Sequence, residues 1–291
     1  MTRWLVTGCY GQLGTDLQGV LAAAPEDVVR AVDVDVLDIT DSAAVGAALD
    51  EFGPDILVNA AAYTAVDAAE ENEDLAFRVN ATGPGVLAAA MARHGGRLMH
   101  VSTDYVFAGD AGRPYEVDDI PDPRSAYGRT KLAGELAVRE LWPDDSFVVR
   151  TAWVYGAAGA NFVKTMARLE GERDTVSVVD DQHGSPTWSA DLARALVELA
   201  RADCPSGIYH CTGGGETTWY GFARAIFEEL GADPDRVKPI GTDEFPVPAP
   251  RPAYSVLSAA RWLAAGLTPL PSWRDALTCA FESDFAALRS R

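Results

Sequence analysis

Residues 4–14 read WLVTGCYGQLG, an apolar run that passes directly into three regularly spaced glycines. The run predicts a short buried strand, and the residues after it predict a helix that continues to Leu21. Glycines at a strand-to-helix turn let the backbone approach a pyrophosphate, which then lies on the amino end of the helix. In this context the GxxGxxG spacing predicts a dinucleotide site at Gly8, Gly11 and Gly14. The alternative is that the glycines only turn the chain.

An acidic residue follows at the distance that such a site uses. Asp33 closes a second predicted strand, at 28–32. A carboxylate there accepts hydrogen bonds from the adenosine ribose and repels a 2′-phosphate, which favours NADH over NADPH. Arg30 is close by, and the alternation of the strand does not fix its direction. The preference between NADH and NADPH is therefore left open.

Strands and helices alternate through the first half of the chain. Further strands are predicted at 55–60, 97–102 and 147–154, and helices at 41–52, 74–94 and 125–141. This alternation is typical of a doubly wound parallel α/β sheet, a Rossmann fold, which we place at residues 1–155.

The pattern loosens after Gly156. Helices at 190–201 and 220–230 stand between loops rich in glycine and proline, and 246–252 reads as an extended connection. We expect residues 156–291 to form mainly a smaller α/β domain that binds the substrate. The boundary is soft, and a segment exchanged between the two domains is expected.

Composition narrows the classes of function. The 291 residues include 24 Lys and Arg against 43 Asp and Glu, a formal net charge of −19. Such a surface repels phosphate backbones and anionic lipids, so nucleic-acid and membrane-surface partners are not expected. The apolar run at the start is too short for a signal peptide, and no stretch approaches the length of a membrane span. We expect a cytoplasmic protein.

The cysteines give no sign of disulfides or of a metal site. Cys9, Cys204, Cys211 and Cys279 form no CxxC pair, and no histidine cluster supplies zinc-ligand spacing. We expect reduced thiols and no bound metal.

A second motif points to acid–base chemistry. Tyr127 and Lys131 are separated by four positions, which places both on one face of a helix. A cation beside the phenol would lower its pKa toward neutrality. Ser102 and Thr103 end a predicted strand at the carboxyl edge of the sheet, where a hydroxyl can polarise a carbonyl group. A tyrosine–lysine pair alone is more often a solvated helix face; the combination with a strand-end hydroxyl and the glycine motif predicts a reductase.

With these motifs the chain resembles the extended short-chain dehydrogenase/reductase family, and within it the dTDP-4-dehydrorhamnose reductases. The resemblance covers nearly the whole chain. It is carried by TGCYGQLG (7–14), NAAAYTAVDAAE (59–70), VSTDYVFAGD (101–110), YGRTKLAGE (127–135), RTAWVYG (150–156), VVDDQHGSPT (178–187) and RPAYSVLS (251–258).

The resemblance implies residue roles. Tyr127 would be the proton donor, Lys131 its pKa partner and Thr103 the assisting hydroxyl. Besides the three glycines, Tyr127 and Lys131, the NADPH or NADH site would include Gln12, Leu13, Asp33, Asp38, Ile39, Ala62, Tyr63 and Thr64. The sugar site would include Val66, Asp67, Thr103, Asp104, Tyr105, Trp153 and Asn161. A lone tryptophan such as Trp153 is otherwise usually a core residue.

The resemblance also implies the reaction and its alternatives. It implies reduction of the C4 ketone of dTDP-4-dehydro-L-rhamnose to dTDP-L-rhamnose by NAD(P)H. A related dTDP-keto-sugar reductase of antibiotic biosynthesis, such as a dihydrostreptose-forming enzyme, would use the same motifs. A sugar epimerase, a dehydratase or a non-catalytic regulatory subunit fits less well. The termini lack the glutamates through which some members bind magnesium between subunits, so we expect a monomer or a weak homodimer.

Overall fold

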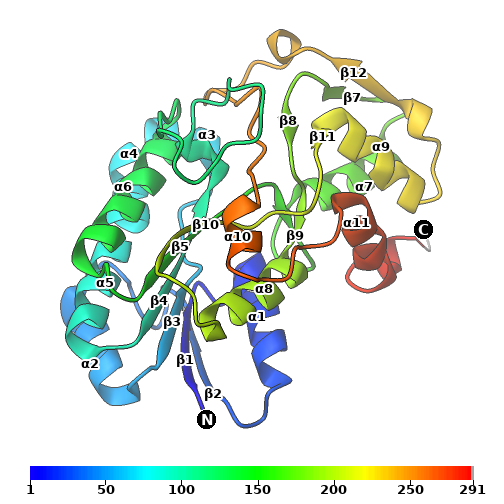
Figure 1. Cartoon of the computed structure of the whole chain (residues 1–291). Coiled ribbons are helices and arrows are strands. Elements are labelled where there is room, and N and C mark those ends of the chain that lie inside the picture. The colour runs from blue at the N-terminus through cyan, green and yellow to red at the C-terminus, as the bar shows by residue number, and fades with distance from the viewer. Residues whose placement is uncertain (290–291) are drawn as a thin grey trace.

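The computed structural model describes residues 1–289, and a six-stranded parallel sheet forms the centre of this part of the chain (Figure 1). The strand order is β10-β5-β4-β3-β1-β2. The bounds are Arg3–Thr7 for β1, Val28–Val32 for β2, Ile56–Asn59 for β3, Arg97–Thr103 for β4, Ser146–Thr151 for β5 and Gly207–His210 for β10. The predicted Rossmann architecture is confirmed.

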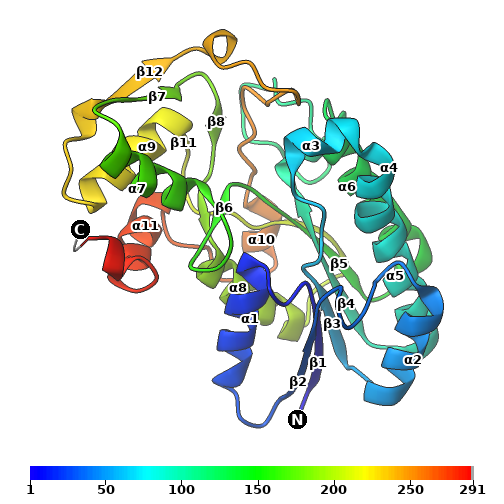
Figure 2. The same cartoon turned by 180° about the vertical axis from the view of Figure 1, so that it is seen from behind.

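Helices cover both faces of the sheet (Figures 1 and 2). On one face lie α2 (Ser42–Phe52), α5 (Gly83–His94) and α6 (Ala126–Leu141), and on the other α1 (Gln12–Ala22) and α8 (Ser189–Arg201). Alternation along β1 divides the core accordingly: Trp4 and Val6 pack with α1 and α8, whereas Leu5 packs toward α2 and α5. Both faces of the strands are buried, as a parallel sheet requires.

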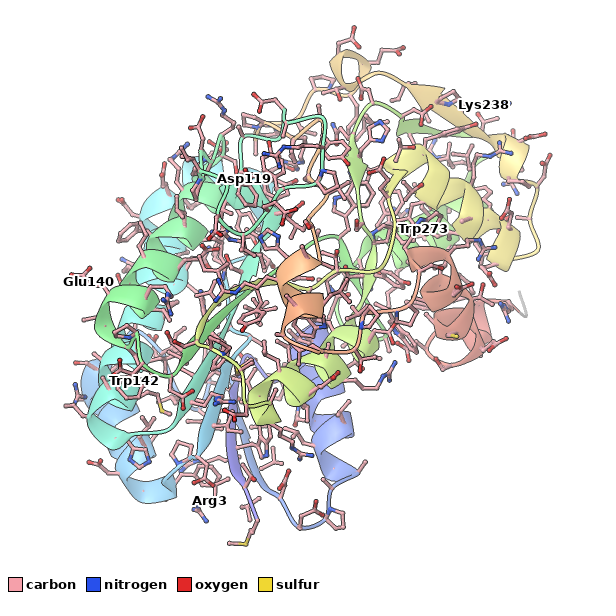
Figure 3. The ribbon with its side chains drawn as sticks, viewed as in Figure 1. Arg3, Asp119, Glu140, Trp142, Lys238 and Trp273 are labelled. Carbon is pink, nitrogen blue, oxygen red and sulfur yellow. The ribbon has the colours of Figure 1, made fainter. Side chains whose placement is uncertain are left out.

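The second half of the chain contributes to this sheet as well as forming its own unit. Strand β10 pairs with β5, and α8 packs against α1. The remaining elements surround a separate core that includes Tyr155, Phe222 and Phe281. They are α7 (Phe162–Glu172), α9 (Trp219–Glu229), α11 (Trp273–Glu282), the parallel pair β7 (Val176–Val179) and β12 (Val237–Ile240), and the short strands β6 (Val154–Tyr155), β8 (His183–Gly184), β9 (Thr187–Trp188) and β11 (Thr217–Thr218). Trp273, labelled in Figure 3, belongs to α11. Its ring meets that of Phe222 at 6.0 Å, edge to face, which joins α11 to α9. A domain boundary near residue 155 stays a prediction.

Several predicted elements have different bounds. The helix expected at 74–94 is three pieces: α4 (Glu73–Phe77), a π-helical turn (Arg78–Thr82) and α5. The strand expected at 147–154 ends at Thr151 because Trp153 has a left-handed backbone (φ 48°), and β6 begins after it. Helices α3 (Val66–Glu71), α7, α10 (Ala260–Ala264) and α11 were not predicted. Within residues 1–289, no helix combines the length and apolar character that a membrane span needs.

Candidate active site

A cleft of about 960 Å³ runs along the carboxyl ends of the sheet strands. Segments that follow β1 to β5 form one wall, and residues of the second half of the chain, among them Ala160, Leu192 and Trp219, close the other. Most predicted site residues line this cleft: Gly8, Gly11, Gln12, Leu13, Gly14, Asp33, Asp38, Ile39, Ala62, Tyr63, Thr64, Val66, Thr103, Asp104, Tyr105, Tyr127, Lys131 and Trp153.

The glycine loop leaves space where side chains would collide. Gly8 has a left-handed backbone (φ 72°), and a Cβ there would lie 2.6 Å from the backbone nitrogen of Ala61. A Cβ on Gly14 would lie 2.1 Å from the carbonyl oxygen of Gly8. Helix α1 begins after Gly11, and no side chain of the described residues caps its amino end. Its first amide groups thus remain available to an anion, so the loop fits a dinucleotide pyrophosphate.

The acidic residue beyond β2 is fixed by backbone amides. Asp33 accepts hydrogen bonds from the Tyr10 nitrogen at 3.0 Å and from the Val34 nitrogen at 2.8 Å. The direction of Arg30, which the sequence leaves open, is away from the cleft: its guanidinium pairs with Glu51 at 2.9 Å. The end of the cleft beside β2 therefore presents a carboxylate without Arg30 beside it.

Helix α6 brings Tyr127 and Lys131 to the end of β4. Ser125 caps the helix by accepting a hydrogen bond from the Gly128 nitrogen at 3.1 Å. A Cβ on Gly128 would lie 2.2 Å from the Tyr105 carbonyl oxygen, so glycine permits this close approach. Lys131 is buried, and its Nζ donates to the carbonyl oxygen of Val101 on β4 at 2.7 Å.

The expected effect of Lys131 on Tyr127 is not what the structure shows. Burial raises the pKa of Tyr127 above its ordinary value, the hydrogen bond with Thr103 opposes this rise, and the charge of Asp104 adds to it. Burial also lowers the pKa of Lys131 to about 8, against the pull of Glu135. Because desolvation disfavours both charged forms, the tyrosine stays protonated at neutral pH.

Thr103 and Asp104 form a polar turn beside Tyr127. The Thr103 hydroxyl donates to Asp104 Oδ1 at 2.9 Å and accepts from the Tyr105 nitrogen at 3.2 Å. Burial raises the pKa of Asp104 to about 6, and its Oδ2 has no hydrogen-bond partner among the described residues. The Tyr105 ring meets that of Tyr127 edge to face, with centroids 5.6 Å apart. A buried carboxyl oxygen without a partner, in a cleft wall, is suited to binding a ligand hydroxyl.

A buried ion pair supports this wall from behind. Glu135, one helical turn beyond Lys131, accepts from Arg150 of β5 at 2.7 Å and from the Ser102 hydroxyl at 2.5 Å. The side chains of Arg150 and Glu135 are only 1% and 2% exposed. The pair ties α6 to β4 and β5.

Trp153 lies in the cleft, but its ring is not a bare wall. It stacks on Trp219 of α9 with centroids 3.5 Å apart and planes at 8°. A Cβ on Gly184 would lie 2.4 Å from the same indole, so a glycine is required beneath it. The flat surface in the cleft is thus formed by two stacked tryptophans, and the sequence around Trp153 did not indicate Trp219 as its partner.

Two predicted sugar-site residues are occupied with other contacts. Asp67 pairs with Arg251 at 2.7 Å. Asn161 caps α7 and donates to Gln12 Oε1 at 2.9 Å, which joins the second half of the chain to the glycine loop. Neither is among the described residues that line the cleft.

The loop at 182–187, part of the motif VVDDQHGSPT, lies behind the cleft wall. Gln182 donates to Thr242 at 2.9 Å, and Ser185 donates to the Gly215 carbonyl oxygen at 2.7 Å. The described cleft lining includes no residue of this loop. The loop supports the wall, since Gly184 packs beneath Trp153.

Arg251 and Trp219 line the cleft and were not predicted as site residues. Arg251 begins the motif RPAYSVLS, which carries the resemblance, so the sequence held a signal for it. For Trp219 it held none, because tryptophans that begin amphipathic helices usually pack in cores.

The remaining sequence expectations concern thiols and metals. Cys9, Cys204, Cys211 and Cys279 are all free. In the described part of the chain, no three His, Cys, Asp or Glu side chains gather into a group that could hold a metal ion.

Comparison with known proteins agrees with this geometry. Residues 2–284 match the family described as "RmlD substrate binding domain". A dTDP-4-dehydrorhamnose reductase of Streptomyces griseus is 53% identical over 96% of this chain and 93% of its own length. A dTDP-4-keto-6-deoxy-D-glucose reductase of Streptomyces niveus is 50% identical over 96% of both chains.

Solved structures extend the similarity to three dimensions. The crystal structure of a dTDP-4-dehydrorhamnose reductase from Bacillus anthracis in complex with NADP is 40% identical, with a TM-score of 0.93, and the match covers 97% of this chain and 99% of that one. The chain therefore belongs to the RmlD substrate binding domain family, the family of the dTDP-4-dehydrorhamnose reductases, as its motifs predicted.

Proposed function

We propose that the protein reduces the C4 ketone of dTDP-4-dehydro-L-rhamnose to dTDP-L-rhamnose with NADPH or NADH. The observation that carries this proposal is the meeting of Thr103, Tyr127 and Lys131 in the same cleft as the uncapped amino end of α1. Family membership and the relative that is 53% identical support the choice of substrate.

The geometry supports a proton-transfer role for Tyr127. When bound, the nicotinamide supplies the hydride that the ketone carbon accepts. The carbonyl oxygen then needs a proton, and the Tyr127 phenol holds one because burial keeps it protonated. The Thr103 hydroxyl donates to Asp104 Oδ1 in this structure; turned toward Tyr127, it would donate to the phenolate that results. The Lys131 ammonium adds positive charge to this end of the cleft.

The choice between cofactors is part of the proposal. The Asp33 carboxylate favours NADH, whereas the relative from Bacillus anthracis was solved with NADP. Both cofactors belong in the first assay.

That assay follows NADH and NADPH oxidation by absorbance, with the keto-sugar formed in situ from dTDP-glucose by a dehydratase and an epimerase. We expect one cofactor oxidised per dTDP-L-rhamnose formed. Oxidation of neither cofactor would refute the proposal. Cofactor that is recycled without net consumption would indicate an epimerase or a dehydratase instead.

A second candidate is another dTDP-keto-sugar reductase. The relative from Streptomyces niveus, a dTDP-4-keto-6-deoxy-D-glucose reductase, is 50% identical, close to the 53% of the rhamnose-type relative. The two candidates differ in whether the epimerase is needed. Turnover of the dehydratase product without epimerase would favour this second reaction.

Location in the cytoplasm and a monomeric or weakly dimeric state complete the proposal. The absence of a membrane-spanning helix from residues 1–289 and the acidic composition support the first. Sedimentation velocity over a range of protein concentrations tests the second.

A further inference from the structure

The cleft is poor in positive charge. The protein carries a formal net charge of −19, and Asp33, Asp38 and Asp104 all line the cleft. Among the described lining residues, only Lys131 and Arg251 are cations. Lys131 is buried at the end of β4 and donates to the Val101 carbonyl oxygen. Any anionic group that binds away from the glycine loop must therefore be offset mainly by Arg251.

The chain fixes Arg251 in position from both sides. Asp67 accepts from the Ala249 nitrogen at 3.1 Å and from the Arg251 guanidinium at 2.7 Å. Farther along, the Tyr254 nitrogen donates to the Gly109 carbonyl oxygen at 2.8 Å, and the Ser255 nitrogen donates to that of His183 at 2.9 Å. The segment 249–255 is thus held by both halves of the molecule and carries Arg251 into the cleft.

The guanidinium retains donor capacity. Arginine has five N–H donors in a planar fork, and the contacts of Arg251 with Asp67 and with the Ala249 carbonyl oxygen use only part of them. Its side chain is 19% exposed, so a ligand in the cleft can reach it. A simple structural ion pair would also explain the contact with Asp67, but it would not explain why Arg251 itself lines the cleft.

Arg251 also lies on the correct side of the reacting group. Its charge acts on the phenol of Tyr105, and the Tyr105 ring meets that of Tyr127 at 5.6 Å. Tyr105 therefore lies near both the proton donor Tyr127 and the cation Arg251, and all three line the cleft. A sugar whose C4 is at Tyr127 would direct its C1 substituent, on the opposite side of the ring, away from Tyr127.

We propose that Arg251 binds the diphosphate of the nucleotide-linked substrate, and that Asp67 contacts Arg251 rather than the sugar. This inference rests on the proposed function, because it takes a nucleoside diphosphate sugar as the ligand. A planar guanidinium binds phosphate oxygens through two parallel hydrogen bonds, which a lysine cannot reproduce.

The test measures binding without turnover. The dissociation constants of dTDP and thymidine are compared by calorimetry for the wild type, Arg251→Gln and Arg251→Met. The glutamine can still donate to the Ala249 carbonyl oxygen and to Asp67, so it carries the test if the methionine variant does not fold. Arg30→Met is the matched control, because it removes one charge and one ion pair, with Glu51, outside the cleft.

We expect both Arg251 variants to bind dTDP at least about tenfold more weakly, with thymidine binding unchanged and NADH binding intact. Arg30→Met should match the wild type. The inference is overturned if the Arg251 variants bind dTDP as tightly as the wild type does, or if they lose affinity for dTDP and thymidine equally. It is also overturned if the wild type does not prefer dTDP to thymidine. The binding measurement does not require turnover, so it remains decisive even if the reductase assay fails.

Discussion

At the scale of single residues, burial determines the chemistry of the cleft. Tyr127, Lys131 and Asp104 are all desolvated, and burial favours the neutral form of each. For a reductase this is useful, since the ketone needs a proton from a group that still holds one at neutral pH. The sequence correctly brought Tyr127 and Lys131 together but could not show that desolvation would outweigh their attraction.

Replacing Tyr127 by phenylalanine should abolish turnover. The substitution removes the proton donor and little volume, so we expect kcat to fall by about 10²-fold or more. Binding of NADH or NADPH, followed by fluorescence titration, should stay close to that of the wild type. Full activity in the variant would remove Tyr127 from the mechanism.

Asp104 should make stability depend on pH. Its pKa is raised from 3.8 to about 6 in the folded protein, so its contribution to folding is complete below the unfolded pKa and is lost as the pH rises through 6. Asp104→Asn should remove this loss, which is on the order of 3 kcal/mol. The measurement is the free energy of unfolding between pH 4 and pH 8 for both proteins. Parallel curves would show that Asp104 does not titrate in this range.

At the scale of elements, α6 carries three titratable residues on one face. Tyr127, Lys131 and Glu135 follow at intervals of four, so the helix presents the phenol and the ammonium to the cleft and the carboxylate to β5. The first two were predicted from this spacing. The role of Glu135 depends on Arg150 and Ser102, whose strands only the tertiary structure places beside the helix.

Glu135→Gln should affect both stability and pH dependence. Loss of the carboxylate leaves Arg150 buried without a counter-charge, which typically costs about 3–5 kcal/mol. It also removes the group that supports the charge of Lys131, so the pKa of Lys131 should fall further below 8. We expect a lower unfolding temperature and a basic limb of kcat/KM that moves to lower pH. Glu172→Gln, at the exposed pair with Arg168, is a control that should change neither strongly.

Gly184 of β8 leaves room for the indole of Trp153, a residue that lies between β5 and β6. A Cβ at this position would lie 2.4 Å from the Trp153 indole, so Gly184→Ala should displace the ring from its stack on Trp219. We expect KM for the keto-sugar to rise and the near-ultraviolet circular dichroism of the tryptophans to change, while cofactor binding persists. Gly171→Ala, where a Cβ meets nothing within 4 Å, is the matched control.

At the scale of the whole molecule, the two halves depend on each other. Strand β10 completes the sheet beside β5, and the buried side chains of α8, such as Leu192 and Leu196, cover Trp4 and Leu17. The cleft also takes its far wall from the second half. The predicted exchange of segments is consistent with these contacts, and a division near residue 155 stays a prediction.

A fragment of residues 1–155 should therefore not fold stably by itself. It would expose the edge of β5 and the apolar face of β1 and α1 that α8 covers. We expect aggregation or a broad thermal transition in circular dichroism, against one cooperative transition for the whole chain. A cooperative, monomeric fragment would show that the first half is independent.

The sequence by itself determined the local features: five of the six strands of the sheet, the glycine turn, the Tyr127–Lys131 spacing and the family motifs. It did not predict β10. Each of these local features depends on residues close together in the chain, where periodicity and backbone sterics are decisive. Only the tertiary structure decided which residues meet across long separations, such as Trp153 with Trp219, Glu135 with Arg150, and Asp67 with Arg251, which are 184 positions apart. It also decided the protonation of the site, because desolvation depends on all that packs around a group, and no local pattern encodes that.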